Sequence, residues 1–284
     1  MRYLRSLLVF LWMAITVIPL ATLIILFAPL VSTDRLWWWF AQPYLRGAIN
    51  AAKWVGGVKY RVWGELNLPD QTAGHRIILC PKHQSTWETF FFPSMMPQPL
   101  AYVFKRELLY IPFFGWALAL LDMVHIDRSA RSEAWAKVAT LGERLMDNGK
   151  WIIMFPEGTR TPRGEKGIYK TGAARLAIAT SASIIPIAVS SGRCWPRRTF
   201  SFIPGTIDVS IGPPMSAEAD ESPNDLMQRV EQWIETEMRA IDAEAYSDSV
   251  AIQASTQRVA PQAETIAEPS SGNGSKDPYT GENV

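Results

Sequence analysis

The feature that most constrains this chain is a long stretch near its start without a charged side chain. From Leu7 to Val31, about 25 consecutive residues are uncharged and mostly apolar, and Arg2 and Arg5 precede them. A stretch of that length can cross a bilayer as a single helix. It is longer than the apolar core of a signal peptide and shows no clear cleavage site, so we expect it to be retained.

The residues after this stretch are rich in tryptophan and in basic side chains. Three adjacent tryptophans begin at Trp37, and residues 35–55 add further aromatic, arginine and lysine side chains. Tryptophan concentrates where one side of a surface is apolar and the other is wet. We therefore predict that residues 1–57 form a two-helix membrane anchor, with the second helix in the lipid headgroup region. Pro19 permits a re-entrant first helix as well as a straight span.

The composition argues against several classes of function. The 284 residues carry a formal charge of +1, whereas a nucleic-acid-binding protein usually has a strong basic excess. The two cysteines, Cys80 and Cys194, make no disulfide framework and are compatible with a reducing compartment. The three histidines lack the spacing of a metal site, so we expect neither a metal nor another cofactor.

Apolar runs alternate with helical periodicity beyond residue 57. The runs that predict β-strands are Lys59–Gly64, Arg76–Cys80, Leu100–Phe104, Met123–Asp127, Trp151–Phe155, Ile184–Val189 and Thr206–Ile211. Helical patterns cover residues 86–96, 132–148, 171–180 and a segment that begins with a capping box at Ser222. This alternation predicts an α/β domain over residues 58–246, with a central mixed, largely parallel sheet covered by helices. The polar tail, residues 247–284, has no periodicity and should be disordered.

A histidine and a carboxylate stand where the strand at 76–80 gives way to the helix at 86–96. Five residues along a helix rotate a side chain by about 140°, so His83 and Glu88 meet only if His83 lies in the loop and Glu88 in the first turn. Glu88 would then hold one ring nitrogen while the other takes a proton from a substrate hydroxyl. The plainer alternative is a structural hydrogen-bonded pair.

A basic cluster follows the third predicted strand. Lys105 and Arg106 stand at its end, where two cations suit an anionic ligand. A solvated basic turn explains the same two residues equally well.

A second charged cluster, Phe155–Arg160, follows the apolar run that begins at Trp151. Its glycine allows a tight turn, and the guanidinium of Arg160 can bind phosphate oxygens bidentately. Glu157 would either fix Arg160 or accept a hydrogen bond from a glycerol hydroxyl, and Lys166 and Lys170 add positive charge downstream. The alternative is a turn closed by a local Glu157–Arg160 ion pair.

Four blocks of this sequence resemble those of the glycerolipid acyltransferase family, whose best-known members are the 1-acyl-sn-glycerol-3-phosphate acyltransferases of the PlsC type. The blocks are His83–Glu88, Lys105–Glu107 with Pro112 and Gly115, Phe155–Arg160, and Ile185–Ala188. They occur in the family's order within residues 60–215. One position departs from the family, because the acid of the first block is usually aspartate and here it is Glu88.

The resemblance implies transfer of a fatty acyl group from acyl-CoA or acyl-carrier protein to the sn-2 hydroxyl of 1-acylglycerol 3-phosphate, which makes phosphatidic acid. By the resemblance, His83 is the general base and Glu88 its orienting carboxylate. The residues that would bind the phosphate and glycerol end of the acceptor are Glu157, Gly158, Thr159 and Arg160, assisted by Lys105 and Arg106. The partners implied are a membrane lipid substrate and the acyl thioester co-substrate, and the oligomeric state stays open.

Several alternatives stay open at this point. The acceptor could be another lysolipid or glycerol 3-phosphate, and a covalent route could use Cys80 or Ser85. A hydrolase is disfavoured because no Gly-x-Ser-x-Gly elbow is present, and a membrane-tethered lipid-binding protein is the non-enzyme alternative. Basic residues on both sides of the first helix favour a re-entrant seating, with the active site on the cytosolic face of the inner membrane.

Overall fold

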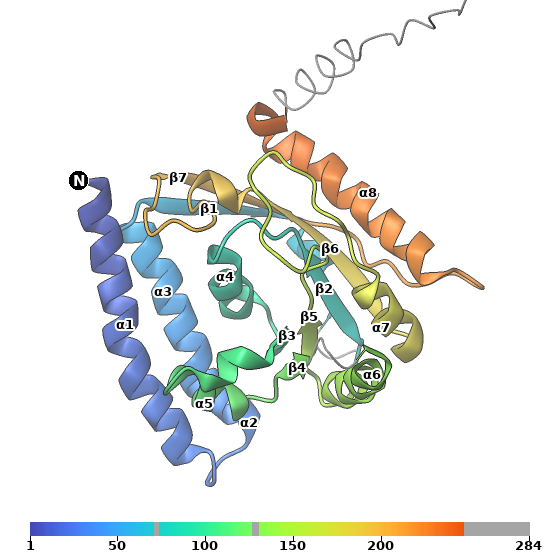
Figure 1. Cartoon of the computed structure of the whole chain (residues 1–284), viewed down its shortest axis with the longest axis horizontal. Helices are drawn as coiled ribbons and strands as arrows, with labels where there is room; N and C mark the ends of the chain where they lie inside the picture. Colours follow the sequence, from blue (N-terminus) through green and yellow to red (C-terminus); the bar gives the residue numbers. More distant parts are fainter. Residues whose placement is uncertain (71–73, 127–130, 247–284) are drawn as a thin grey trace, which may run out of the picture.

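A seven-stranded sheet in the order β1-β7-β6-β2-β5-β3-β4 forms the centre of the computed structural model (Figure 1). The structure describes residues 1–70, 74–126 and 131–246. Side chains are described for all of these except 104–106, 125, 126 and 131–137. The strands are β1 (Val58–Trp63), β2 (Ile77–Pro81), β3 (Leu100–Lys105), β4 (Val124–Ile126), β5 (Trp151–Ile153), β6 (Ser183–Val189) and β7 (Gly205–Ile211). Neighbouring strands are parallel except β6 and β7.

The prediction of an α/β fold with a mixed, largely parallel sheet is therefore confirmed. Each predicted strand is present with small differences at its ends, although Asp127 lies outside the described residues. The central strand β2 is buried at all five positions, as expected for a strand with helices on both faces. The edge strand β1 instead alternates between more and less buried residues.

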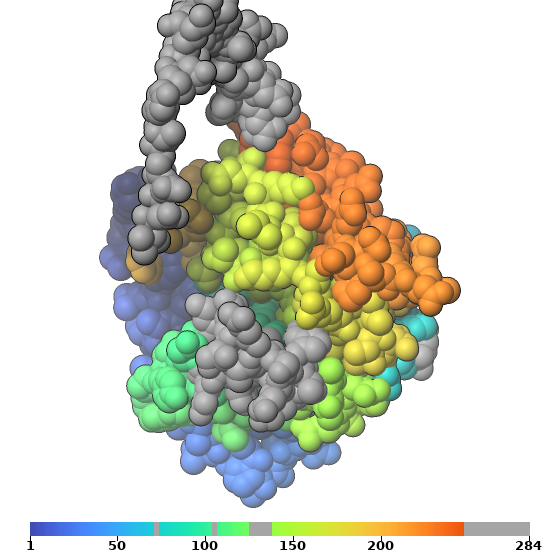
Figure 2. Space-filling model, turned by 45° about the vertical axis from the view of Figure 1, so that its right-hand side comes forward, coloured from blue at the N-terminus to red at the C-terminus, as the bar shows by residue number. Residues whose placement is uncertain are grey.

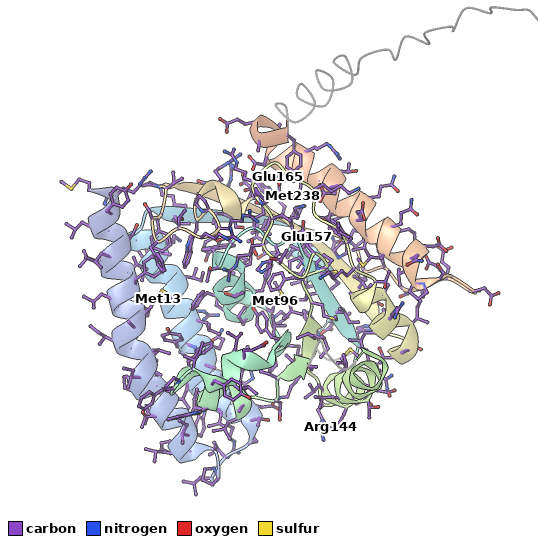
Figure 3. The ribbon with its side chains drawn as sticks, viewed as in Figure 1. Met13, Met96, Arg144, Glu157, Glu165 and Met238 are labelled. Carbon is purple, nitrogen blue, oxygen red and sulfur yellow. The ribbon has the colours of Figure 1, made fainter. Side chains whose placement is uncertain are left out.

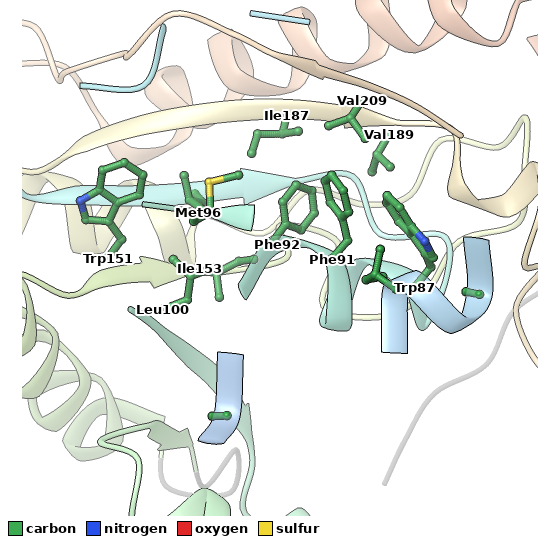
Figure 4. Packing of buried hydrophobic residues seen from close by; sticks show 14 of the residues in the cluster. Trp87, Phe91, Phe92, Met96, Leu100, Trp151, Ile153, Ile187, Val189 and Val209 are labelled. Carbon is green, nitrogen blue, oxygen red and sulfur yellow. The ribbon is translucent and has the colours of Figure 1, made fainter. Parts of the chain in front are cut away.

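Helices cover both faces of the sheet. One face packs against α6 (Arg131–Asp147), α7 (Gly172–Thr180) and α8 (Pro223–Ile241). α8 begins as predicted, with the Ser222 side chain accepting a hydrogen bond from the Asp225 backbone N–H. The other face packs against α4 (Trp87–Met95), and Figure 4 shows Trp87, Phe91 and Phe92 of this helix against strand residues. Each large apolar side chain buried in this way stabilises the fold by roughly 1.5–3 kcal/mol.

The N-terminal residues form two helical segments that lie side by side (Figure 1). The first is α1 (Arg2–Phe27), and in the described part of the chain it alone is long and apolar enough to cross a membrane. The second consists of α2 (Thr33–Leu36), the π-helical turn η1 (Trp37–Ala41) and α3 (Gln42–Trp54). It is not a second apolar span, because α3 is polar on one side and packs on α4 with the other.

The three adjacent tryptophans at the π-helical turn η1 differ in their exposure to solvent. Trp37 is 3% exposed and belongs to the core, whereas Trp38 and Trp39 are 40% and 54% exposed. The expectation that this aromatic run lies wholly in a headgroup layer is therefore wrong for Trp37. Successive side chains of a helix point about 100° apart, so neighbouring tryptophans divide between the protein interior and the outside.

Polar contacts hold the second helical segment on the rest of the protein. Thr33 donates a 2.6 Å hydrogen bond to Asp122, and Asp34 forms an ion pair with Lys150. Gln42 donates a 3.1 Å hydrogen bond to the carbonyl oxygen of Ser94 at the end of α4. The boundary at residue 57 stays a prediction, and the predicted tail lies outside the described residues.

Candidate active site

The loops that follow β2, β5 and β6 meet at the carboxyl ends of these three central strands. These strands are parallel neighbours, so their carboxyl ends lie together, which is where open α/β sheets place their ligand sites. His83 follows β2, Glu157 follows β5 and Ser191 follows β6. Three segments that are far apart in the sequence therefore build one site.

His83 and Glu88 contact one another as the spacing predicts. His83 lies in the loop before α4, Glu88 lies in the first turn of α4, and the distance from His83 Nδ1 to Glu88 Oε2 is 2.5 Å. The imidazole ring also stacks on Phe155, with the ring centroids 3.8 Å apart. These contacts hold the ring in one orientation and leave Nε2 as the nitrogen available to a ligand.

Glu88 is fully buried and is held through both oxygens. Its Oε1 accepts 2.9 Å hydrogen bonds from the backbone N–H groups of Gln84 and Ser85 and a further bond from the hydroxyl of Ser191. A buried carboxylate needs such donors, because losing water without replacing its hydrogen bonds is costly. Sequence reasoning missed Ser191, which lies 103 positions from Glu88 and is brought there by β6.

The backbone of His83 is fixed from two directions. Its N–H donates a 2.9 Å hydrogen bond to Glu157 Oε2, and its carbonyl oxygen accepts a 2.8 Å bond from the N–H of Thr161. The hydroxyl of Thr161 bonds to the same carbonyl oxygen at 3.1 Å. The Phe155–Arg160 cluster therefore supports the histidine loop directly.

Glu157 belongs to a buried charge cluster behind the histidine. Lys82 Nζ lies 2.7 Å from Glu157 Oε1 and 2.7 Å from Glu235 Oε1 of α8, and its side chain is 0% exposed. Tyr169 donates a 2.8 Å hydrogen bond to Glu235, and burial raises the pKa of this tyrosine well above its usual range. Figure 3 shows Glu157 in the interior of the protein.

The alternative in which Glu157 forms an ion pair with Arg160 is not observed for these two residues. The carboxylate of Glu157 is instead occupied by Lys82, the N–H of His83, the hydroxyl of Thr161 and the N–H of Gly167. Sequence reasoning had no sign of Lys82 as a partner, because a lysine beside a histidine gives no periodic signal and 75 positions separate it from Glu157.

A cavity of about 1110 Å³ opens in front of His83. Most of its wall is apolar and comes from α1, η1, α3, α4 and α5 (Phe114–Ala119). The other end carries the cations Arg160, Lys170, Arg197 and Arg198, and no aspartate or glutamate is among the described lining residues. The arrangement suits a ligand with a long apolar part and an anionic group.

The predicted phosphate-binding turn lies in the wall of this cavity. Gly158, Thr159 and Arg160 line it, and Gly158 has a φ of +66°, which favours glycine. A Cβ atom on Gly158 would lie 2.8 Å from Lys170 Nζ, so the glycine also makes room for this lysine. Lys105 is the last residue of β3 and Arg106 begins η4 (Arg106–Tyr110), while their side chains lie outside the described ones.

The two candidate nucleophiles of a covalent route are poorly placed. Cys80 lies within β2 and is fully buried, and burial raises the pKa of its thiol far above the usual range. Ser85 is also fully buried, and its hydroxyl accepts a 3.0 Å hydrogen bond from the N–H of Trp87. Neither side chain lines the cavity. In the part of the chain that the structure describes, no group of three metal-ligating side chains is arranged around a common point.

The sequence pattern of the Acyltransferase family matches residues 59–190, the part of the chain that contains the histidine–carboxylate pair and the strands β2 to β6. The chain is 39% identical over 240 residues to a 1-acyl-sn-glycerol-3-phosphate acyltransferase of Pseudomonas aeruginosa. This match covers 84% of this chain and 91% of the relative. The chain therefore belongs to the acyltransferase family, in the group of 1-acyl-sn-glycerol-3-phosphate acyltransferases.

One further relative agrees with this assignment, and one solved structure agrees with the fold. A 1-acyl-sn-glycerol-3-phosphate acyltransferase of Saccharomyces cerevisiae is 32% identical over 172 residues, which is 60% of this chain and 55% of the relative. The crystal structure of the 1-acyl-sn-glycerophosphate (LPA) acyltransferase PlsC from Thermotoga maritima matches with a TM-score of 0.71 at 21% identity. It covers 86% of this chain and 98% of that chain, and it supports the fold.

Proposed function

We propose that the protein transfers a fatty acyl group from an acyl thioester to the sn-2 hydroxyl of 1-acylglycerol 3-phosphate (lysophosphatidic acid), forming phosphatidic acid. The observation that carries this proposal is the His83–Glu88 pair, joined at 2.5 Å, with His83 in the wall of a cavity that is lined by apolar side chains and by four cations. The acyl donor is acyl-CoA or acyl-carrier protein. No cofactor enters the chemistry.

The geometry supports a direct transfer with His83 as the general base. Nε2 takes the proton of the acceptor hydroxyl while the hydroxyl oxygen attacks the thioester carbonyl carbon. Collapse of the tetrahedral intermediate breaks the carbon–sulfur bond, and the proton on His83 passes to the departing sulfur to give a free thiol. Glu88 on Nδ1 keeps the neutral ring in the tautomer that accepts at Nε2 and stabilises the imidazolium formed during the step.

The phosphate of the acceptor would lie against the turn that follows β5. Gly158, Thr159 and Arg160 line the cavity there, and the Nε atom of Arg160 is buried without a hydrogen-bond partner in the structure. A buried guanidinium nitrogen without a partner favours an oxyanion ligand. Lys105 and Arg106 would assist. We assign Glu157 to positioning this turn and His83, because its oxygens already accept internal hydrogen bonds.

We infer that the N-terminal helices seat the protein on a membrane without carrying the active site across it. α1 is attached to the α/β domain at more than one place. Ser6 accepts a hydrogen bond from the N–H of Phe202 near one end, and the helix also packs on α5. The outward side of α1 remains apolar, with Leu7, Leu11, Ile15 and Ile18 about half exposed. This supports a helix lying flat in the cytosolic leaflet of the inner membrane.

The acceptor is tested with purified protein, a labelled acyl-CoA and separate acceptors: lysophosphatidic acid, lysophosphatidylcholine and glycerol 3-phosphate. We expect labelled phosphatidic acid from lysophosphatidic acid alone. A product from another acceptor, without phosphatidic acid, would replace the proposed substrate. Binding of lysophosphatidic acid without any product from acyl-CoA or acyl-carrier protein would support the lipid-binding alternative instead.

A further inference from the structure

Two cations in the cavity wall have no role in the function proposed above. Arg197 and Arg198 line the cavity from the loop that follows η5 (Ser191–Arg193). Arg160 and Lys170 line it from the loop that follows β5. Two different loops therefore bring two pairs of cations to one end of the cavity.

The two pairs are in direct contact through one hydrogen bond. Arg197 Nη1 donates a 2.9 Å hydrogen bond to the backbone carbonyl oxygen of Arg160. This bond holds the two arginine-bearing loops together. The backbone of Arg198 has a φ of +59°, a value that non-glycine residues seldom adopt.

Other arginines of the same two loops are neutralised, which makes the contrast informative. Arg163 follows Arg160 in one loop and Arg193 precedes Arg197 in the other, and both lie 2.7 Å from the buried carboxylate of Asp242. In contrast, Arg160, Lys170, Arg197 and Arg198 form no ion pair with any residue in the described ranges. The cations that face the cavity are thus the ones left without a carboxylate.

The number of these charges exceeds what one acceptor phosphate needs. A phosphate monoester carries a charge of about −1.5 to −2 near neutral pH. Four unpaired cations therefore fit two anionic substrates better than one. The reaction proposed here has a second anionic substrate, because acyl-CoA and acyl-carrier protein both carry the acyl chain on a phosphorylated pantetheine arm.

We propose that Arg197 and Arg198 form a binding site for the phosphate of the donor's pantetheine arm, separate from the acceptor site at Arg160 and Lys170. Each pair combines one exposed residue, Lys170 or Arg198, with one half-buried residue, so exposure alone does not separate the sites. The loop of Arg197 and Arg198 is assigned to the donor, whose bulk stays in water while its thioester reaches His83. The buried Nε of Arg160 suits a phosphate that enters the cavity on a lipid. This inference rests on the acyl transfer proposed above.

The test compares three thioester donors with the same acyl chain: acyl-CoA, acyl-carrier protein and the N-acetylcysteamine thioester, which lacks phosphate. For Arg197→Gln/Arg198→Gln, we expect KM for both phosphorylated donors to rise ~10- to 100-fold, the effect of losing charge-assisted hydrogen bonds. For the single variant Arg198→Gln, which leaves the hydrogen bond between Arg197 and the Arg160 carbonyl in place, KM for lysophosphatidic acid and the rate with the phosphate-free thioester should change by less than about twofold while the donor KM rises. A larger effect on acyl-CoA than on acyl-carrier protein would identify the additional CoA phosphates as part of the ligand.

Matched variants separate the rise in donor KM from the general effect of removing a positive charge and from misfolding. Arg144→Gln removes a cation at the outer edge of α6 (Figure 3) and should leave both KM values unchanged. Arg160→Gln should raise KM for lysophosphatidic acid and leave the donor KM near its wild-type value. Arg197→Lys keeps the positive charge but replaces the forked guanidinium by a single nitrogen. Its donor KM should therefore lie between those of the wild type and the double variant.

Direct titration of coenzyme A into the purified protein gives a readout that does not depend on turnover. We expect the double variant to bind coenzyme A ~10-fold or more weakly than the wild type and Arg144→Gln. A rise in KM for lysophosphatidic acid without a change in donor KM or coenzyme A binding would overturn the proposal. A wild-type protein that binds coenzyme A through these arginines but makes no phosphatidic acid would overturn the proposed function and leave the binding site standing.

Discussion

Nζ of Lys82 lies 2.7 Å from Oε1 of Glu157, and neither side chain is accessible to solvent. The second oxygen of Glu157 accepts the hydrogen bond from the N–H of His83. A buried ion pair therefore lies directly behind the proposed general base and connects it to Glu235 of α8. On the face shown in Figure 2, the loop after β5, in yellow-green, lies beside the orange α8, consistent with the Arg163–Asp242 and Lys166–Glu231 ion pairs.

Removing the cation from this cluster should destabilise the fold strongly. Lys82→Met leaves two carboxylates buried together, and breaking a buried ion pair by removing one partner costs about 3–5 kcal/mol. Urea denaturation of the purified protein measures the change. The control is Glu231→Gln on α8, the helix that also carries Glu235. Its partner Lys166 is about half exposed, and a surface pair of this kind contributes about 0–1 kcal/mol. Equal effects of the two variants would contradict the proposed importance of the buried pair.

Substitution of Glu157 separates positioning from substrate binding. Glu157→Gln keeps the shape but weakens the hydrogen bond that fixes the N–H of His83. We expect kcat to fall about tenfold or more with little change in KM for lysophosphatidic acid, because the residue acts through the base. Steady-state kinetics at varied acceptor concentration give both values. A raised KM at unchanged kcat would restore the role expected from the sequence, as an acceptor ligand.

Shortening Glu88 should lower activity even though aspartate is the usual acid of the family. The Glu88 carboxylate reaches His83, two backbone N–H groups and Ser191 at once, and aspartate is shorter by about 1.5 Å. We expect Glu88→Asp to reduce kcat about tenfold and Glu88→Ala to reduce it about 10²- to 10⁴-fold, as does the loss of the base in His83→Ala. Ser191→Ala should cost less than either, because three partners of Glu88 remain. Full activity of Glu88→Asp would show that the backbone adjusts.

The cysteines should affect stability at high pH but not catalysis. Burial raises the pKa of Cys194 from its usual 9.0 to about 11, and that of Cys80 still further. Between pH 9.0 and about 11 the unfolded chain loses these protons while the folded protein keeps them, so stability is complete below pH 9 and falls as the pH rises. Thermal unfolding should show a smaller fall for Cys80→Ala/Cys194→Ala, with acyl transfer retained. Inactivation of the folded wild type by iodoacetamide at pH 7.5 would revive the covalent route.

The sequence predicted the features that depend on neighbouring residues. Apolar runs located the strands, and the five-residue spacing placed Glu88 against His83 because a strand end and a first helical turn are local geometry. The partners Ser191 and Glu235 were out of reach, since their positions depend on β6 lying beside β2 and on α8 crossing the sheet. A Glu157–Arg160 pair was one alternative because the two residues are close in sequence, whereas Glu157 binds the buried Lys82, which periodicity cannot identify.

Arg197 shows a different limit of sequence reasoning. It lies in an irregular loop outside the family's four blocks, and its neighbours in sequence give no sign of a cavity. Its position depends on a hydrogen bond to the backbone of Arg160, which every residue type offers equally. The π-helical turn at Trp37 was unpredictable for a similar reason, because apolar periodicity assumes a regular helix.

The position of α1 has a practical consequence for preparing the enzyme. Val17, Leu20, Ala21 and Ile24 of this helix form part of the wall of the cavity that contains His83. Deleting the N-terminal helices to obtain a detergent-free sample would therefore remove one side of the substrate chamber. Such a truncated protein would be unsuitable for inhibitor screening, because compounds would meet an open apolar surface in place of the enclosed site.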